Sequence, residues 1–235
     1  MKLARWTLGI VGDLLVTAGL VLLLFVGWQL WFTDVTAHRT QDATVSRLTR
    51  DFAKPPTGTP GNPGTENPKA VPFGSAFAIV RIPRFGADYA RPVLEGTSRD
   101  ILQDGIGHYD GTVLPGAVGN FAVAGHRTTY GRPFHDIDTL RPGDLVVVET
   151  KTAYSVYAVK RHEIVAPTDV QVVAPVPDQP GVKPTERWMT MTACHPKYSA
   201  AQRYVVFAQL VKTYKHADGL PAGTLTVPKT LPKKA

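Results

Sequence analysis

Residues 188–193 read Trp-Met-Thr-Met-Thr-Ala, and residues 204–212 read Tyr-Val-Val-Phe-Ala-Gln-Leu-Val-Lys. Both runs are short and rich in β-branched or aromatic side chains, a pattern that is typical of β-strands. Many short strands in one chain predict an all-β domain, either a barrel or a sandwich. Turn residues bound four further runs of the same kind, at 77–82, 120–125, 144–149 and 154–159.

The composition agrees with a β-rich body and limits the number of domains. The chain has 235 residues, of which 43% are hydrophobic, enough for one ordinary domain with two terminal appendages. Its 20 prolines and 21 glycines predict many turns. The formal charge of +7 does not indicate a nucleic-acid partner, because the basic residues are not interleaved with aromatic ones. It fits an anionic cell envelope, or simply a well-solvated surface.

An uncharged apolar segment lies near the N-terminus. Residues 14–32 contain no charged side chain and approach the ~20 residues that a helix needs to cross a bilayer. Trp28 and Trp31 stand where an aromatic belt meets the membrane surface. We therefore expect a transmembrane helix at 13–32.

The flanking charges predict how this helix is oriented. Lys2 and Arg5 precede the apolar segment, which by the positive-inside rule leaves residues 1–12 in the cytoplasm and the rest of the chain outside the plasma membrane. A cleaved signal peptide is the alternative, because Val-Thr-Ala at 35–37 resembles a cleavage site. The apolar segment is longer than the ~7 to 15 residues of such a peptide, which favours retention.

Proline- and glycine-rich sequence separates the apolar segment from the strands. Residues 54–72 carry too little apolar surface to fold, so we expect a flexible linker at 33–75. The strand-rich body is then 76–215, and residues 216–235 are expected to form a loosely ordered basic tail. Within the body, the proline-rich stretch 167–184 predicts a long surface loop.

The single cysteine is the residue that points to chemistry. Cys194 has no partner for an intrachain disulfide, and taken alone such a residue is more often a buried apolar side chain. A nucleophilic thiolate needs a histidine or a cation beside it. His126 follows the run at 120–125, and Arg203 precedes the run at 204–212. All three residues lie at strand ends, where the mouth of a barrel can gather them.

A wider set of motifs surrounds these residues. It comprises Ile82-Pro83, Val93-Leu94-Glu95-Gly96-Thr97, Gly105-Ile106-Gly107-His108-Tyr109, Gly119-Asn120, Ala124-Gly125-His126-Arg127, Leu140, Gly143-Asp144, Thr190-Met191-Thr192-Ala193-Cys194-His195-Pro196 and Arg203-Tyr204-Val205-Val206. With these motifs the chain closely resembles the sortase family, cysteine transpeptidases of Gram-positive cell envelopes. The His-Pro and His-Tyr pairs are most similar to class E, the actinobacterial housekeeping type.

The resemblance implies both a fold and a reaction. The fold is an eight-stranded closed β-barrel with short helical turns, preceded by the membrane helix and the linker. The triad maps onto His126, Cys194 and Arg203, with the Cys194 thiolate attacking the Thr–Gly bond of a sorting signal. His126 would protonate the leaving amine, and Arg203 would donate hydrogen bonds to the substrate or the oxyanion. An amine from a peptidoglycan precursor would then resolve the thioester.

The resemblance also suggests which residues bind the substrate. Class E members imply a Leu-Ala-x-Thr-Gly signal rather than Leu-Pro-x-Thr-Gly, with Tyr109 in contact with its second residue; packing of the Tyr109 ring against the barrel is the alternative. Ala193 stands where the family usually has threonine, and Met191 where it usually has leucine. If that threonine holds substrate, Ala193 removes one donor. Tyr109 and Ala193 are therefore the candidate substrate-binding residues.

No cofactor or metal is expected. His108, His135 and His195 do not have, with Cys194, the spacing of a known metal site, and no acidic cluster suggests calcium. The expected partners are secreted proteins with a C-terminal sorting signal, a peptidoglycan amine and the membrane. Two alternatives stay open: an extracytoplasmic cysteine peptidase that uses water as acceptor, and a non-catalytic envelope-binding domain.

Overall fold

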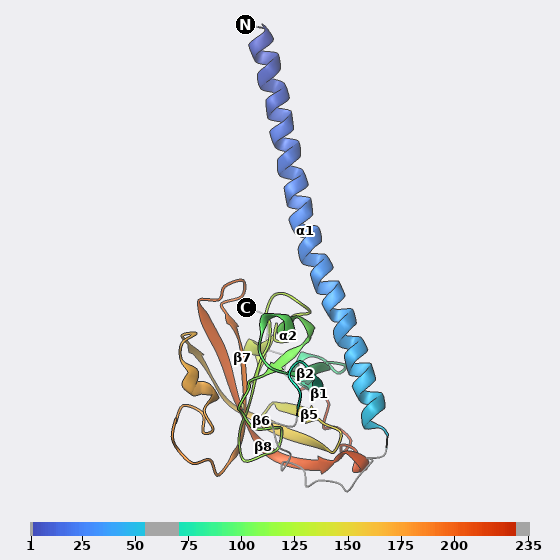
Figure 1. The fold of residues 1–235 in the computed structure, drawn as a ribbon, viewed down its shortest axis with the longest axis vertical. Coiled ribbons are helices and arrows are strands. Elements are labelled where there is room, and N and C mark those ends of the chain that lie inside the picture. The colour runs from blue at the N-terminus through green and yellow to red at the C-terminus, as the bar shows by residue number, and fades with distance from the viewer. Residues whose placement is uncertain (1, 55–70, 229–235) are drawn as a thin grey trace.

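The computed structural model describes residues 2–54 and 71–228, which form a long helix and a barrel (Figure 1). Helix α1 spans Lys2–Phe52, and the short helix α2 spans Arg99–Asp104. The 3-10 turns are η2 Pro83–Phe85, η3 Ile137–Thr139, η4 Val170–Val173 and η5 His216–Asp218. The strands are β1 Ala76–Arg81, β2 Arg91–Glu95, β3 Ile106–His108, β4 Gly119–Ala124, β5 Leu145–Glu149, β6 Ala153–Val165, β7 Arg187–His195 and β8 Gln202–Lys215.

The strands close into a barrel in the order β1-β2-β3-β4-β7-β8-β6-β5, and β5 pairs back onto β1. The pairs β2–β3 and β4–β7 are parallel and the others are antiparallel. This confirms the eight-stranded closed barrel that the sequence implied, and each of the six runs noted above coincides with a strand. Two strands carried no such signal, because β3 has only 3 residues and β2 contains Pro92.

Alternating side chains of β4, β7 and β8 separate a packed interior from an outer face. Successive residues of a strand point to opposite faces of the sheet, so the interior set also fixes the outer set. Where β7 and β8 pair near Cys194, the even-numbered residues of β7 and the odd-numbered residues of β8 therefore lie on the outer face. The interior set is Phe121 and Val123 from β4, Met189, Met191 and Ala193 from β7, and Tyr204, Val206 and Ala208 from β8.

Helix α1 differs from the expected organisation of the N-terminal region. The linker was predicted to begin at residue 33, but α1 continues without a break to Phe52. Figure 1 shows its N-terminal half extending away from the barrel and its C-terminal half lying along the barrel. The prediction of flexibility was wrong for residues 33–52 because it rested on their polar composition, which does not prevent a helix from docking. Residues 55–70 of the predicted linker lie outside the described residues.

One side of α1 contacts the barrel, and we call it the docking face. Its positions alternate by four and three residues, a spacing that places them on one side of a helix. Leu48 and Phe52 are buried against Ile79 of β1 and Ala90, whereas the positions nearer the apolar segment make polar contacts. The docking face consists of Asp34, His38, Gln41, Val45, Leu48 and Phe52.

The two ends of the described chain can be compared with the expected membrane helix and the expected loose tail. Within α1, Gly9–Trp28 is long and apolar enough to cross a bilayer, with a mean hydropathy of 2.4, and it overlaps the expected span at 13–32. At the other end, His216 opens the predicted loose tail but is held by the barrel: its ring stacks on Tyr154 with centroids 4.7 Å apart. Residues 229–235, which carry the terminal lysines, lie outside the described residues.

Candidate active site

Cys194 and Arg203 lie directly opposite each other on adjacent strands. Cys194 is the penultimate residue of β7, and its Cα partner on the antiparallel strand β8 is Arg203. Side chains of such a pair share one face of the sheet with Cβ atoms about 5 Å apart. Because Ala193 points into the barrel, Cys194 and Arg203 belong to the outer face. The half-buried thiol of Cys194 is therefore accessible from outside the barrel.

His126 reaches the same place from the other neighbouring strand. Strand β4 runs parallel to β7, with Ala124 opposite Thr192, and the Gly125 backbone N–H donates to the Thr192 carbonyl at 3.0 Å. His126 stands two residues after the last paired position of β4, and Cys194 stands two residues after Thr192, so both follow the same end of the β4–β7 pair. Cys194 therefore has Arg203 opposite it on β8, and His126 follows β4, the strand on the other side of β7.

The imidazole of His126 is half-buried, and its shielded Nε2 atom is open. Its Nε2 atom has no hydrogen-bond partner among the residues that the structure describes. Burial lowers the pKa of His126 below its usual value, and the positive charge of Arg99 lowers that pKa further. The ring lies against Tyr130, with centroids 5.2 Å apart. A neutral imidazole with a free nitrogen can accept a proton from a neighbouring thiol.

Gly125 allows the chain to place His126 so close to the barrel. A Cβ atom at position 125 would lie 2.6 Å from the ring of Phe134, closer than any side chain permits. The Phe134 backbone N–H also donates to the His126 carbonyl at 3.0 Å. The missing side chain at Gly125 and the buried ring of Phe134 therefore fix the backbone on both sides of His126.

The guanidinium of Arg203 bonds backbone carbonyls near the start of β8. Its Nη1 atom donates to the backbone carbonyls of Ala200 and Gln202, at 2.9 and 3.0 Å. Ala200 lies in the turn between β7 and β8 and Gln202 is the first residue of β8, so the side chain lies along the end of that turn. The backbone of Arg203 lies opposite Cys194, and the Nη1 atom of its guanidinium is engaged with these two carbonyls.

The described geometry can be compared with known proteins. A family model of the sortase domain matches residues 80–211, a range that includes His126, Cys194 and Arg203 and covers more than half of the chain. The chain belongs to the sortase family. Members of this family are cysteine transpeptidases, which agrees with a lone cysteine that lies opposite an arginine and beside a strand that a histidine follows.

The relatives support the resemblance to class E. This sortase is 37% identical to SrtE1 of Streptomyces coelicolor over 219 residues, a match that covers 90% of this chain and 59% of that protein. It is 36% identical to SrtE2 of the same organism over 227 residues, which covers 93% of this chain and 87% of that protein. The solved structure of sortase E from Streptomyces avermitilis superposes with a TM-score of 0.60 at 41% identity, covering 66% of this chain and 99% of the other.

Arg127 is a residue of this sortase to which sequence reasoning gave no role. Its side chain is 2% exposed, and its Nη1 atom donates to the Cys194 carbonyl at 3.4 Å and to His195 Nδ1 at 2.9 Å. Its Nη2 atom pairs with Asp138 at 2.6 Å. Arg127 therefore ties the backbone next to His126 to the backbone of Cys194. The only sequence signal was a charged residue directly after the candidate histidine.

The two candidate substrate-binding residues lie in different environments. The Tyr109 hydroxyl forms a 3.0 Å hydrogen bond with Thr192 Oγ1, two residues before Cys194 on the outer face. Tyr109 is therefore close to the thiol along β7. Ala193, in contrast, is 3% exposed and packs in the barrel interior. Its methyl group has a packing role, and we propose a substrate contact for Tyr109 only.

The long loop predicted at 167–184 covers part of the outer face of this sortase. Asn120 Nδ2 donates to the backbone carbonyls of Val172 and Ala174, at 3.3 and 3.0 Å, and Thr190 Oγ1 donates to Asn120 Oδ1 at 2.9 Å. Val172 packs against outward-facing side chains of β8. The loop therefore forms a wall beside β4 and β7, on the side of Cys194 toward the start of β7.

The other histidines serve structural contacts. His108 is fully buried and bonds Glu95 Oε2 through Nδ1 at 2.6 Å. His135 bonds the Arg127 carbonyl, and the ring of His195 lies 5.7 Å from that of Tyr204, on the interior side of β7. Among residues 2–54 and 71–228, no group of three or more histidine, cysteine or carboxylate side chains is arranged to hold a metal ion.

Proposed function

We propose that this sortase is a membrane-anchored transpeptidase that joins secreted proteins to the cell wall. It would cleave the Thr–Gly bond of a Leu-Ala-x-Thr-Gly or Leu-Pro-x-Thr-Gly signal through a Cys194 thioester, and then pass the acyl group to a peptidoglycan amine. The observation that supports this proposal is the strand register, in which Cys194 on β7 lies opposite Arg203 on β8 and His126 follows β4, the other neighbour of β7.

The chemistry follows from the protonation state of His126. Its neutral imidazole takes the proton of the Cys194 thiol, and the thiolate attacks the threonine carbonyl carbon. When the carbon–nitrogen bond breaks, the imidazolium returns that proton to the glycine nitrogen, which leaves as a free amine. An incoming amine then attacks the thioester, gives up a proton through His126, and restores the thiol.

Arg203 would stabilise the negative charge that develops on the carbonyl oxygen. It starts from contacts with two backbone carbonyls, which are neutral acceptors. A bound oxyanion is a stronger acceptor, and a charge-assisted hydrogen bond to it is worth about 3 kcal/mol where water is excluded. A shift of the Nη1 hydrogen bond from these carbonyls to the oxyanion is therefore favoured.

Tyr109 and the 167–184 loop would border the peptide. The sorting signal is expected to lie on the outer face of β4 and β7, with its threonine at Cys194 and its second residue near Tyr109. The proximity of the Tyr109 hydroxyl to Thr192, two residues from the thiol, supports this direction of binding.

The membrane location is proposed from α1. Gly9–Trp28 would span the bilayer, with Lys2 and Arg5 on the cytoplasmic side and the barrel on the outer face. Helix α1 passes unbroken through residues 35–37, the alternative cleavage site, and Ala37 is 8% exposed within the described structure. An ordered, buried segment at that point supports a retained anchor over a cleaved signal peptide.

Mass spectrometry of the intact protein tests the reaction. After incubation with paired Leu-Ala and Leu-Pro sorting peptides, we expect an acyl adduct on Cys194 that is absent from the Cys194→Ala and His126→Ala variants. Added amine should divert the adduct from hydrolysis to a transpeptidation product. An adduct that releases only the free acid in the presence of amine would favour the cysteine peptidase, and the absence of any adduct would favour a non-catalytic domain.

A further inference from the structure

A strained turn follows the candidate catalytic histidine. Tyr130, Gly131 and Arg132 have φ angles of 52°, 73° and 46°, so three consecutive residues adopt the left-handed conformation. Glycine tolerates this conformation, but for tyrosine and arginine it is unfavourable. Such a turn persists only where its surroundings hold it in place.

Helix α1 contacts each of the three strained residues. Gln41 Nε2 donates to the Tyr130 carbonyl at 3.0 Å, and the Gly131 backbone N–H donates to Asp34 Oδ1 at 2.9 Å. The second oxygen of Asp34 pairs with Arg132 Nε at 2.8 Å. Two side chains of the docking face therefore hold the entire turn.

The contact between α1 and the turn is closely packed. Gln41 is fully buried, and a Cβ atom at Gly131 would lie 2.8 Å from the end of its side chain. The positive φ of Gly131 also disfavours any other residue there. The turn and Gln41 thus fit together only because position 131 has no side chain.

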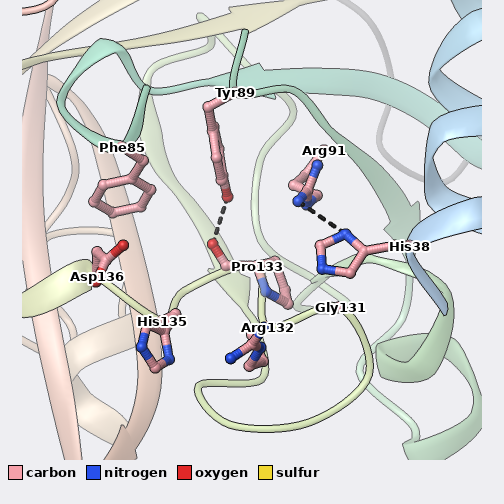
Figure 2. Close-up of a pocket in the computed structure, with 9 residues that line it drawn as sticks. All are labelled: His38, Phe85, Tyr89, Arg91, Gly131, Arg132, Pro133, His135 and Asp136. Carbon is pink, nitrogen blue, oxygen red and sulfur yellow. Dashed lines mark hydrogen bonds between the residues drawn. The ribbon is translucent and has the colours of Figure 1, made fainter. Parts of the chain in front are cut away.

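Next to this contact the turn is not packed against the barrel core. A cavity of about 220 Å³ lies between α1, β2 and the segment that follows the turn. Figure 2 shows Gly131, Arg132 and Pro133 along one side of it, with His38 reaching from α1 toward Arg91. Because open space adjoins the turn, its restraint comes from the polar contacts with α1 and from two backbone hydrogen bonds of Arg132, to the Thr129 carbonyl at 3.1 Å and from the His135 N–H at 3.0 Å.

Tyr130 connects the turn to the site. Its ring lies against that of His126, with centroids 5.2 Å apart and planes inclined at 40°. The ring of Tyr130 is one of the groups that shield the imidazole from water. A displacement of the turn would move this ring and expose His126.

We propose that residues 34–52 of α1 act as a positioning element for His126, through Asp34 and Gln41. These two side chains hold the turn at 130–132 and keep Tyr130 against the imidazole, so the helix that enters the membrane also sets the environment of the general base. The proposal rests on the proposed role of His126, and it makes Asp34 and Gln41 positioning residues that do not touch substrate.

The full chain in detergent micelles or lipid nanodiscs provides the test. Asp34→Ala and Gln41→Ala are compared with Thr40→Ala, a substitution at an exposed position of the same helix. The ring of His126 is titrated by NMR in histidine-labelled protein, its signal being assigned from its loss in His126→Gln. Burial is the main cause of the lowered pKa of His126. Loss of the contacts between α1 and the turn at 130–132 should therefore raise that pKa toward 6.5.

We expect kcat to fall about tenfold or more in both variants, with KM changed far less, because the groups that bind peptide are untouched. Asp34→Asn, which keeps an oxygen acceptor for Gly131 but loses the charge, should recover much of the rate. A His126 titration and a kcat in both alanine variants that match Thr40→Ala would overturn the proposal.

A second pair of variants covers the possibility that the alanine variants unfold. Gly131→Ala forces the turn against Gln41, and the shorter side chain of Gln41→Ala relieves that contact. The effects of the two changes on the His126 pKa should therefore be non-additive. Strict additivity would contradict the proposal that Gln41 holds the turn. If His126→Ala instead retains full acyl-enzyme formation, the proposed function fails, and the titration of wild-type and Gln41→Ala protein still reports whether α1 sets the environment of this histidine.

Discussion

The half-buried imidazole of His126 and the buried guanidinium of Arg127 are adjacent in sequence but differ in their contacts. Among the described residues His126 Nε2 has no hydrogen-bond partner, which the proposed proton exchange with Cys194 requires. Arg127 forms its contacts with the Cys194 carbonyl, His195 and Asp138, and so holds the two strand ends together. In the proposed reaction His126 transfers the proton, and Arg127 fixes the backbone positions that this transfer needs.

The lowered pKa of His126 predicts the acidic limb of the pH–rate profile. In the proposed reaction, acylation requires the His126–Cys194 pair to lose one proton from the state that holds an imidazolium and a thiol. Because the pKa of His126 is lowered, this loss occurs at lower pH than it would with an ordinary histidine. Measured as kcat/KM for peptide cleavage, the midpoint of the acidic limb should lie below 6.5. A midpoint at or above that value would contradict the burial of His126.

Substitution of Arg127 tests the connection between the two strand ends. Arg127→Gln removes the ion pair with Asp138 and the donor to the Cys194 carbonyl. We expect a loss of about 2 kcal/mol in the free energy of unfolding, less than for a fully buried pair, because the Asp138 side chain is 39% exposed. The rate should fall at least about tenfold. Arg141→Gln, at an exposed position nearby, is the control and should leave both quantities nearly unchanged.

At the scale of elements, the sequence indicated the strands that alternate and have ordinary length. It did not indicate β2 and β3, whose shortness and proline leave no periodic pattern, or the docked half of α1. The docking face was missed because its first three positions are Asp34, His38 and Gln41, which look solvent-exposed in a hydropathy pattern. Only the tertiary contacts reveal that these polar side chains face the barrel.

As with the strands and α1, only part of the candidate site was predictable from the sequence. Strand ends and the family motifs predicted that His126, Cys194 and Arg203 would meet, and the register brings their backbones together. The direction of the Arg203 guanidinium, the interior position of Ala193 and the role of Arg127 depend on side-chain packing between distant segments. No local pattern in the sequence encodes those contacts.

The 167–184 loop gives a prediction at the scale of an element. Asn120 holds it with two hydrogen bonds, and Asn120→Ala leaves two loop carbonyls without that donor. We expect KM for the sorting peptide to rise more than kcat falls, since the loop borders the proposed peptide site and does not touch the thiol. Stability should fall by about 1 to 3 kcal/mol. Gln179→Ala, at an exposed position of the same loop, should change neither constant, and equal effects from both variants would contradict the role of Asn120.

For the whole molecule, α1 joins the apolar segment to the barrel without a flexible joint. Asp34 follows Trp28 by six residues, about 9 Å along a helix, and the docking face continues to Phe52. With Gly9–Trp28 in the bilayer, as proposed above, a continuous helix would set the distance of Cys194 from the membrane. The expected linker at 33–75 would instead have let the barrel move over a range of distances.

Insertion of seven helix-forming residues between Trp28 and Asp34 tests this geometry. Such an insertion adds two helical turns, which moves the barrel outward by about 10 Å with little rotation and leaves the docking face intact. In vesicles, cleavage of a soluble sorting peptide should be unchanged, whereas cleavage of a client held in the same membrane should fall severalfold. An equal effect on both substrates would show that the insertion had disturbed the barrel itself.

The turn held by Asp34 and Gln41 has a practical consequence for work with soluble enzyme. A version that begins after Phe52 retains the complete barrel and every residue of the proposed triad, yet it lacks both side chains that restrain residues 130–132. Its kinetic constants and inhibitor affinities would then describe a His126 more exposed to water than that of the native enzyme. A start between Trp28 and Asp34 removes the apolar segment and keeps the restraint, so it is the better starting point for quantitative assays and inhibitor screening.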